Sequence, residues 1–180
     1  HGASLRSIVK SLGMTTGAFY GYYKSKEDLF AALVEDHYRY LLDRFRQAQE
    51  EFAHLPYACQ PEVLGDFSGA CMFDMLHYAY DHLEDCQLLL CCAEGTRFAG
   101  LVDEMVQIET DATHNYFQVL EELGRPVPDI DLRLEHILIT GMFRTFFELI
   151  IHAMPLNEAE NYLREMRAFY TAGWMKIMGQ

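Results

Sequence analysis

Apolar residues recur along most of the chain with the spacing of an α-helix. Leu29, Leu33, Leu41 and Phe45, for example, lie at multiples of four residues from one another and so fall on one face of a long helix. The alternation of apolar and polar residues that marks a half-buried strand is nearly absent, as are internal repeats. The pattern predicts an all-α protein.

Capping residues and helix breakers set the expected helix boundaries near the N-terminus. Ser4 and Thr15 are expected to cap two short helices, the second over residues 16–22, and Gly13 supplies the left-handed residue between them. The sequence SKED, which starts at Ser25, is a capping box that opens a third helix. The third helix is expected to be long.

Two prolines separate the third helix from a set of later helices. The third helix is expected to end near residue 52, before Pro56 and Pro61. Asp129 or Asp131 is the expected N-cap of the last helix but one, and a capping box that starts at Asn157 is expected to open the last. The later helices are predicted over residues 62–80, 82–94, 99–124, 129–153 and 157–178.

The two helices predicted nearest the C-terminus are apolar on more than one face. The helix over residues 129–153 contains the runs ILIT and FFELII, and the helix over residues 157–178 is rich in aromatic residues and methionine. A helix that is apolar on two faces must bury both, so one face is expected to meet the core and the other a second chain. We therefore predict a homodimer through these two helices.

The charge of the chain is divided unevenly. The formal net charge of −13 argues against a nucleic-acid partner, because DNA affinity depends on Lys and Arg that neutralise phosphates. Residues 1–26, however, contain Arg6, Lys10, Lys24 and Lys26 and no acidic residue, so this segment carries +4 and the rest of the chain −17. An acidic body repels DNA everywhere except at the basic end, which orients the approach.

The basic segment has the pattern of a helix-turn-helix. Two short helices are separated by Gly13 and a brief turn, and the second helix is rich in small and hydroxylic residues. Small side chains let the start of that helix approach base edges, and its free amides favour phosphate. The candidate DNA contacts are Thr15, Thr16, Gly17, Ala18, Tyr20, Tyr22, Lys24 and Lys26.

The aromatic residues of this segment allow two interpretations. Tyr20 and Tyr22 lie on different sides of the helix and could each offer a hydroxyl to one flank of a groove. Lys26, in the first turn of the long helix, opposes the helix dipole by about 0.3–1 kcal/mol, which a nearby anion would explain. The alternative is a small aromatic core with solvated lysines. Phe19 and Tyr23, four residues apart, are expected in the core under either interpretation.

The stretch from Leu5 onward resembles the signature of a known family. It reads LRSIVKSLGMTTGAFYGYYKSKEDLFAAL and is similar to the helix-turn-helix of the tetracycline-repressor (TetR) family, which has a glycine turn, a small-residue recognition helix, an aromatic pair and then Ser-Lys-Glu. Val9, Leu12 and Tyr23 depart from the usual residues. The matching positions are Ile8, Gly13, Thr15, Gly17, Tyr20, Tyr22, Ser25, Lys26, Glu27 and Leu29.

The resemblance implies two domains with different functions. Residues 1–30 would form the module that binds a palindromic operator DNA, with Tyr20 and Tyr22 near the backbone and Lys26 on a phosphate. Residues 31–180 would form an effector-binding and dimerisation domain whose last two helices build an intermolecular four-helix bundle. Such a protein is expected to be a repressor that a small molecule releases. The family's module has three helices, so the first is expected to be missing from this chain, which begins just before the second.

An effector pocket is expected to combine apolar walls with a few polar groups. The abundance of methionine and aromatic residues suits a hydrophobic, shape-tolerant cavity, although core packing explains the same residues. Candidates on helix faces expected to point inward are Cys71, Met75, Tyr78, Cys92, Met105, Thr113, Tyr116, Phe117, Thr140, Phe143 and Phe147.

A metal site is an alternative use of the histidines and cysteines. His77, His82 and Cys86 lie at spacings of five and four, with Cys91 and Cys92 beyond them. The chain has no CxxC or HxxxH pair, so core thiols and surface histidines are expected instead. The sequence predicts no metal and no cofactor.

Other classes of protein lack their usual motifs. The sequence shows no nucleophile elbow, no phosphate-cradling glycine loop and no inward carboxylate pair, so enzymatic activity is not expected. It has no run of 18 apolar residues and no signal-peptide pattern, so we expect a cytoplasmic protein with no membrane partner. The alternative that stays open is a helical ligand-binding or enzymatic domain whose DNA-binding module is vestigial.

Overall fold

The computed structural model describes residues 4–177, apart from the side chains of residues 66–68. These residues form helices and no strand, which confirms the predicted all-α class. In chain order the helices are α1 (Leu5–Ser11), α2 (Thr16–Tyr22), α3 (Lys26–Ala53), α4 (Gln60–Asp81), α5 (Leu83–Cys92), α6 (Leu101–Glu122), α7 (Leu132–Ile151) and α8 (Leu156–Ile177).

The first three helices begin where the capping residues predicted. The side-chain oxygens of Ser4, Thr15 and Ser25 each accept a hydrogen bond from the backbone N–H three residues ahead, at 3.2, 3.1 and 3.0 Å. Each cap satisfies an amide that the first turn of a helix leaves without a partner. Gly13 has φ +65°, so it supplies the left-handed conformation that ends α1.

The last two helices begin differently from the prediction. Helix α7 begins at Leu132 rather than at 129, because the Oδ1 atom of Asp131 accepts hydrogen bonds from the next amides at 2.9 and 3.2 Å. The predicted capping box at Asn157 is wrong. The Pro155 carbonyl accepts the first amide bonds of α8, at 2.9 and 3.0 Å, so Asn157 already lies inside the first turn.

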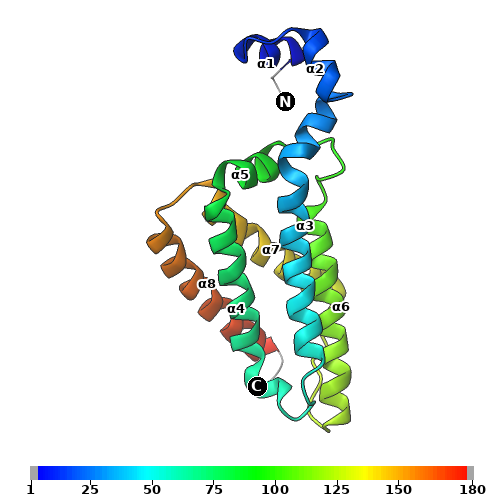
Figure 1. Cartoon of the computed structure of the whole chain (residues 1–180). Helices are drawn as coiled ribbons and strands as arrows, with labels where there is room; N and C mark the ends of the chain where they lie inside the picture. The colour runs from blue at the N-terminus through cyan, green and yellow to red at the C-terminus, as the bar shows by residue number, and fades with distance from the viewer. Residues whose placement is uncertain (1–3, 178–180) are drawn as a thin grey trace.

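Helices α3–α8 form the body, and α1 and α2 project from the N-terminal end of α3 (Figure 1). Helix α3 packs against α4, α5 and α6, α6 packs against α7, and α8 packs against α4 and α7. Helices α1 and α2 pack mainly against each other. Within the described residues, α3 is therefore the main physical link between the N-terminal module and the body.

Two groups of buried residues hold the body together. The larger group joins α3 to α7, where the rings of Phe45 and Phe143 meet edge to face at 5.1 Å between centroids. The smaller group lies at the far end of α3 and α6, where Phe52 contacts Tyr116 at 5.8 Å. These contacts hold α3 against the body from Phe30 to Phe52.

Large apolar side chains remain exposed on α7 and α8 in the single chain. In the described part of the chain thirteen large apolar residues are exposed, and eight of them lie on these two helices. Ile137 on α7 is 63% exposed and Phe169 on α8 is 74% exposed. Such a concentration on one pair of helices is typical of an interaction surface.

Among residues 4–177, no helix combines the length and the apolar character that crossing a bilayer requires.

Candidate nucleic-acid interface and ligand cavity

Helix α2 is held in place by one buried ring and presents its start to solvent. Phe19 is 3% exposed, and its ring contacts that of Tyr23 at 5.6 Å between centroids. Thr16, Gly17 and Ala18, in the first turn, are exposed. Among residues 4–177, no other part of the chain therefore covers the small residues that are predicted to meet base edges.

The exposure of the tyrosines bears on the two interpretations of the aromatic segment. Tyr20 is 57% exposed and Tyr22 is 78% exposed, whereas Phe19 is buried and Tyr23 is half-buried. Phe19 packs against Tyr23, as expected, and the ring of Tyr20 also lies edge-on to that of Phe19, at 5.6 Å between centroids. Both hydroxyls are free to meet a partner, although their contact with DNA stays a prediction.

The basic side chains of the module are exposed and unpaired. Arg6, Lys10, Lys24 and Lys26 have no ion-pair partner among residues 4–177. Asp28, one of the two acids that directly follow Lys26, accepts a hydrogen bond from the backbone N–H of Lys24 at 3.0 Å. This geometry leaves the four cations available for phosphates.

The residues predicted to line an effector pocket are spread over several environments. Tyr78 stacks on Tyr40 at 3.5 Å between ring centroids and lies 2.9 Å from the Nδ1 atom of His37. Thr140 has a buried hydroxyl with no hydrogen-bond partner in the described residues. Cys92 and Phe117 are half-buried, and only Thr113 and Tyr116 of the predicted set line the main cavity. Cys71, Met75, Met105, Phe143 and Phe147 are buried in the core.

The main cavity lies in the half of the body remote from α1 and α2. It encloses about 180 Å³ between α3, α4, α6, α7 and α8. Pockets for drug-sized ligands hold about 300–1,000 Å³, so the cavity suits a compact ligand. Its walls are mostly apolar, with four aromatic side chains among them. The lining residues include Gln49, Phe52, Glu109, Tyr116, Arg167, Tyr170 and Trp174.

The lining of this cavity includes one carboxylate, that of Glu109. Glu109 on α6 is half-buried, and its Oε2 atom accepts a hydrogen bond from the side-chain amide of Gln49 at 2.7 Å. Burial raises the pKa of Glu109 to about 7, the Gln49 hydrogen bond opposes this rise, and the nearby charge of Glu135 adds to it. The group therefore changes its charge in the physiological pH range.

Glu109 was not among the site residues predicted from the sequence, although the sequence contains a signal for it. Met105, Glu109, Ala112 and Tyr116 follow one another at helical spacing, so the acid interrupts the apolar stripe of α6. Trp174, the single tryptophan of the chain, was also missed and lines the same cavity. A charged residue within an apolar stripe is a candidate for a ligand-binding group.

A second hollow adjoins the main cavity along the outer surface of α3 and α6. It has a volume of about 460 Å³, and its walls include Arg46, Glu50, Asp111 and Glu122, which are all exposed. Its lining is formed by these two helices and the segment that follows α3. The main cavity, enclosed by five helices, is the better candidate for a specific ligand.

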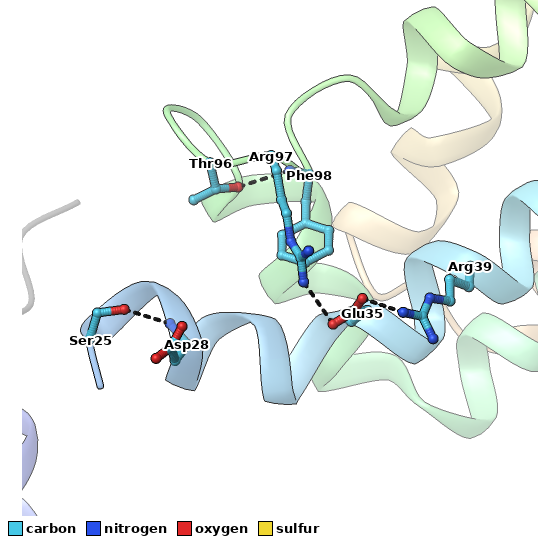
Figure 2. A network of polar contacts seen from close by, with 7 residues as sticks. All are labelled: Ser25, Asp28, Glu35, Arg39, Thr96, Arg97 and Phe98. Atoms are coloured by element: carbon cyan, nitrogen blue, oxygen red, sulfur yellow. Dashed lines mark hydrogen bonds and ion pairs between the residues drawn. The ribbon is translucent and has the colours of Figure 1, made fainter. Parts of the chain in front are cut away.

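A polar and aromatic network joins the loop before α6 to the first half of α3. Figure 2 shows Glu35 of α3 between two arginines, Arg39 on the same helix and Arg97 in the loop. The Nη2 atom of Arg97 lies 2.8 Å from the Oε2 atom of Glu35. Phe98 lies against the ring of Tyr38 at 5.3 Å, and the Tyr38 hydroxyl donates to Glu104. The start of α6 is thus fastened to α3 near the N-terminal module.

The histidines and cysteines are dispersed through the body. Within residues 4–177 no group of three or more His, Cys, Asp or Glu side chains has the geometry to hold a metal ion. His77 lies 2.7 Å from a carboxylate oxygen of Glu160, and the ring of His82 lies against that of His37. The cysteines are free, and burial raises the pKa of the Cys71 and Cys86 thiols to about 12, so both stay protonated.

The fold and the exposed basic module together define a helix-turn-helix DNA-binding protein with a helical body. Residues 1–33 match the sequence profile of the family described as bacterial regulatory proteins, tetR family. No curated protein and no solved structure matches the chain. The match over the N-terminal module supports a DNA-binding transcriptional regulator of the tetR type.

Proposed function

We propose that this regulator is a cytoplasmic, homodimeric repressor that leaves its palindromic operator when a small molecule enters the main cavity. The observation that carries the proposal is the position of α3. Its N-terminal end carries the helix-turn-helix, and Gln49 and Phe52 near its C-terminal end form part of the cavity wall. A ligand that moves this wall moves the helix to which the DNA-binding module is attached.

Operator binding follows from the exposed surface of α2. Thr15, Thr16, Gly17 and Ala18 are proposed to face base edges, while Tyr20, Tyr22, Lys24 and Lys26 are proposed to contact the backbone. In a two-fold dimer, two copies of α2 would meet successive major grooves about 34–36 Å apart or at a somewhat larger spacing. Salt-dependent binding of the dimer to a palindromic duplex tests this proposal. Its absence would favour a ligand-binding domain with a vestigial module.

The proposed phosphate contact of Lys26 can be separated from base recognition. Lys26→Ala is expected to weaken binding to all duplexes alike and to lower the magnitude of the log–log salt slope by about 1 for each phosphate lost, because fewer counterions are released. Thr16→Ala is expected to change the preferred base instead. Fluorescence anisotropy with specific and random duplexes at several salt concentrations measures both effects.

Arg125→Ala is the matched control for Lys26→Ala, since Arg125 is an exposed cation between α6 and α7. It is expected to leave the salt slope unchanged. An unchanged slope for the Lys26 variant would remove this lysine from the phosphate contacts.

A further inference from the structure

The carboxylate of Glu109 has no cationic partner in the described residues, although it lies in an apolar wall. Its Oε2 atom is bonded to the Gln49 amide, and no hydrogen bond or ion pair to its Oε1 atom occurs among residues 4–177. A carboxylate in such a place is costly unless it is neutralised or paired. The cavity therefore lacks a positive charge on the side of α6.

Arg167, the cation that also lines the cavity, is held elsewhere. Its Nη2 atom donates to the Gly65 carbonyl at 2.8 Å, and its guanidinium lies over the ring of Phe73 at 5.7 Å. The guanidinium occupies the space beside Gly69, where a Cβ atom would lie 1.6 Å from Nη2. The absence of a side chain at Gly69 thus lets Arg167 bind α4 rather than Glu109.

A second acid, Glu135, lies close enough to Glu109 for its charge to raise the pKa of Glu109. Glu135 on α7 is 1% exposed, and its Oε2 atom lies 2.9 Å from the Nε2 atom of His114. Its other oxygen is buried with no hydrogen-bond partner in the described residues. Two acidic side chains, Glu109 and Glu135, thus lie on this side of the cavity, an arrangement that favours a positive ligand over an anion.

Aromatic rings surround the remaining space. Phe52, Tyr116, Tyr170 and Trp174 come from α3, α6 and α8 and line the same cavity as Glu109. The faces of such rings attract cations, most strongly when water is excluded. The combination of one carboxylate and several aromatic side chains is the chemistry that recognises an organic ammonium group.

From these contacts we propose that the effector is a compact organic cation with an apolar body, whose positive group lies at Glu109 and whose body contacts the aromatic side chains. The inference rests on the proposed function in taking the cavity as the effector site. A neutral ligand would leave the carboxylate unpaired, and an anion would face Glu109 and Glu135. The cavity thus favours the cation over both.

Three probes of nearly the same shape test the proposal. Benzyltrimethylammonium carries a permanent positive charge, neopentylbenzene is its uncharged carbon isostere, and phenylmethanesulfonate is an anion of similar size. Binding to the whole protein is followed by the fluorescence of Trp174, the single tryptophan, which lies in the cavity wall. The ammonium probe is expected to bind at least about 10-fold more tightly than the other two, because it alone gains the coulombic attraction of the Glu109 carboxylate and the attraction of the aromatic ring faces.

Glu109→Gln identifies the group responsible. The variant keeps the size of the side chain, and it removes a carboxylate whose raised pKa weakens the folded state as pH rises from about 4.5 to about 7. The variant is therefore expected to be at least as stable as the wild type at neutral pH. It should bind the ammonium probe about 10-fold more weakly and neopentylbenzene unchanged. Glu121→Gln, an exposed acid of the same helix, is the matched control and should change neither affinity.

The pH dependence gives an independent readout. Because the ammonium probe needs the ionised carboxylate, its affinity should rise with pH and level off above about 7, with release of a proton on binding. Neopentylbenzene and the Glu109→Gln variant should lack this rise. The groups that face Glu109 are Gln49 on α3, Cys71 on α4, the Glu135–His114 pair on α7 and α6, and Arg167 and Tyr170 on α8.

Several results would overturn the proposal. They are equal or absent binding of the three probes, tighter binding of the sulfonate, or an unchanged ammonium affinity in Glu109→Gln. A rise with pH that persists in that variant would show that Glu109 is not the group whose ionisation controls binding. The titrations contain no DNA, so these failures leave operator binding untouched, while failure of the proposed function would appear as loss of salt-dependent duplex binding.

Discussion

Ile137→Asp is expected to reduce affinity for a palindromic operator by about 10²–10⁴-fold, because it would separate the two subunits of the proposed homodimer. Ile137 is exposed on α7, so the aspartate is tolerated in a single chain. In a dimer built on α7 and α8 the same carboxylate would be buried without a partner, at a cost of several kcal/mol. Two modules on one duplex bind with a high effective concentration, and a monomer loses this advantage. Sedimentation and operator titration of the same samples measure both steps.

The matched control for Ile137→Asp is Tyr57→Asp, which places the same charge at an exposed side chain between α3 and α4. It should leave both the mass and the operator affinity unchanged. If the Ile137 variant remained a dimer, α7 would not form the interface. A wild-type chain that sediments as a monomer at micromolar concentration would refute the homodimer itself.

The sequence predicted the local features of this molecule well, because capping depends on neighbours within three or four residues. Ser4, Thr15 and Ser25 cap as expected, and Gly13 is left-handed as expected. The prediction of Asn157 as the first capping residue of α8 was wrong, because the Pro155 carbonyl already accepts the first amide hydrogen bonds of that helix. A helix can begin at several adjacent residues with similar energies, so its first residue is the least certain part of such a prediction.

The cavity could not be predicted in the same way. Choosing residues on inward faces selected the deepest side chains, such as Met75, Met105 and Phe143, which fill the core completely. A cavity forms where facing side chains leave space, and this depends on how far apart whole helices lie. Glu109 was identifiable as an acid in an apolar stripe. That it lines the same cavity as Trp174 of α8, however, depends on the tertiary fold.

Cavity and operator are expected to be coupled by a factor of about 5–150, equivalent to about 1–3 kcal/mol. Glu109 lies five residues beyond Glu104 on α6, and Glu104 accepts the hydrogen bond from Tyr38 of α3. A ligand at Glu109 that shifts α6 therefore pulls on α3 close to the helix-turn-helix. By linkage, operator binding must weaken binding of the ligand by the same factor.

The double variant Tyr38→Phe/Arg97→Ala is expected to reduce this factor about threefold or more, because it removes two contacts between α3 and the start of α6. The phenylalanine keeps the ring against Phe98 while losing the hydroxyl, and the loss of the Arg97 guanidinium ends the ion pair with Glu35. Arg39→Ala is the matched control, since it breaks a pair with the same Glu35 inside α3 and leaves the link to the loop intact. Calorimetric titration of benzyltrimethylammonium, with and without a duplex selected by the wild-type protein, measures the factor for each protein.

The outcomes of these titrations distinguish two routes of communication. If the double variant loses coupling and Arg39→Ala keeps it, the signal passes from α6 through the loop to the first half of α3. If both keep it, the signal instead enters α3 at the cavity wall, through Gln49 and Phe52, and travels along the helix. Equal ligand affinities with and without operator in the wild type would show that cavity and DNA-binding module are independent, and the effector-released repressor would then be ruled out for this ligand.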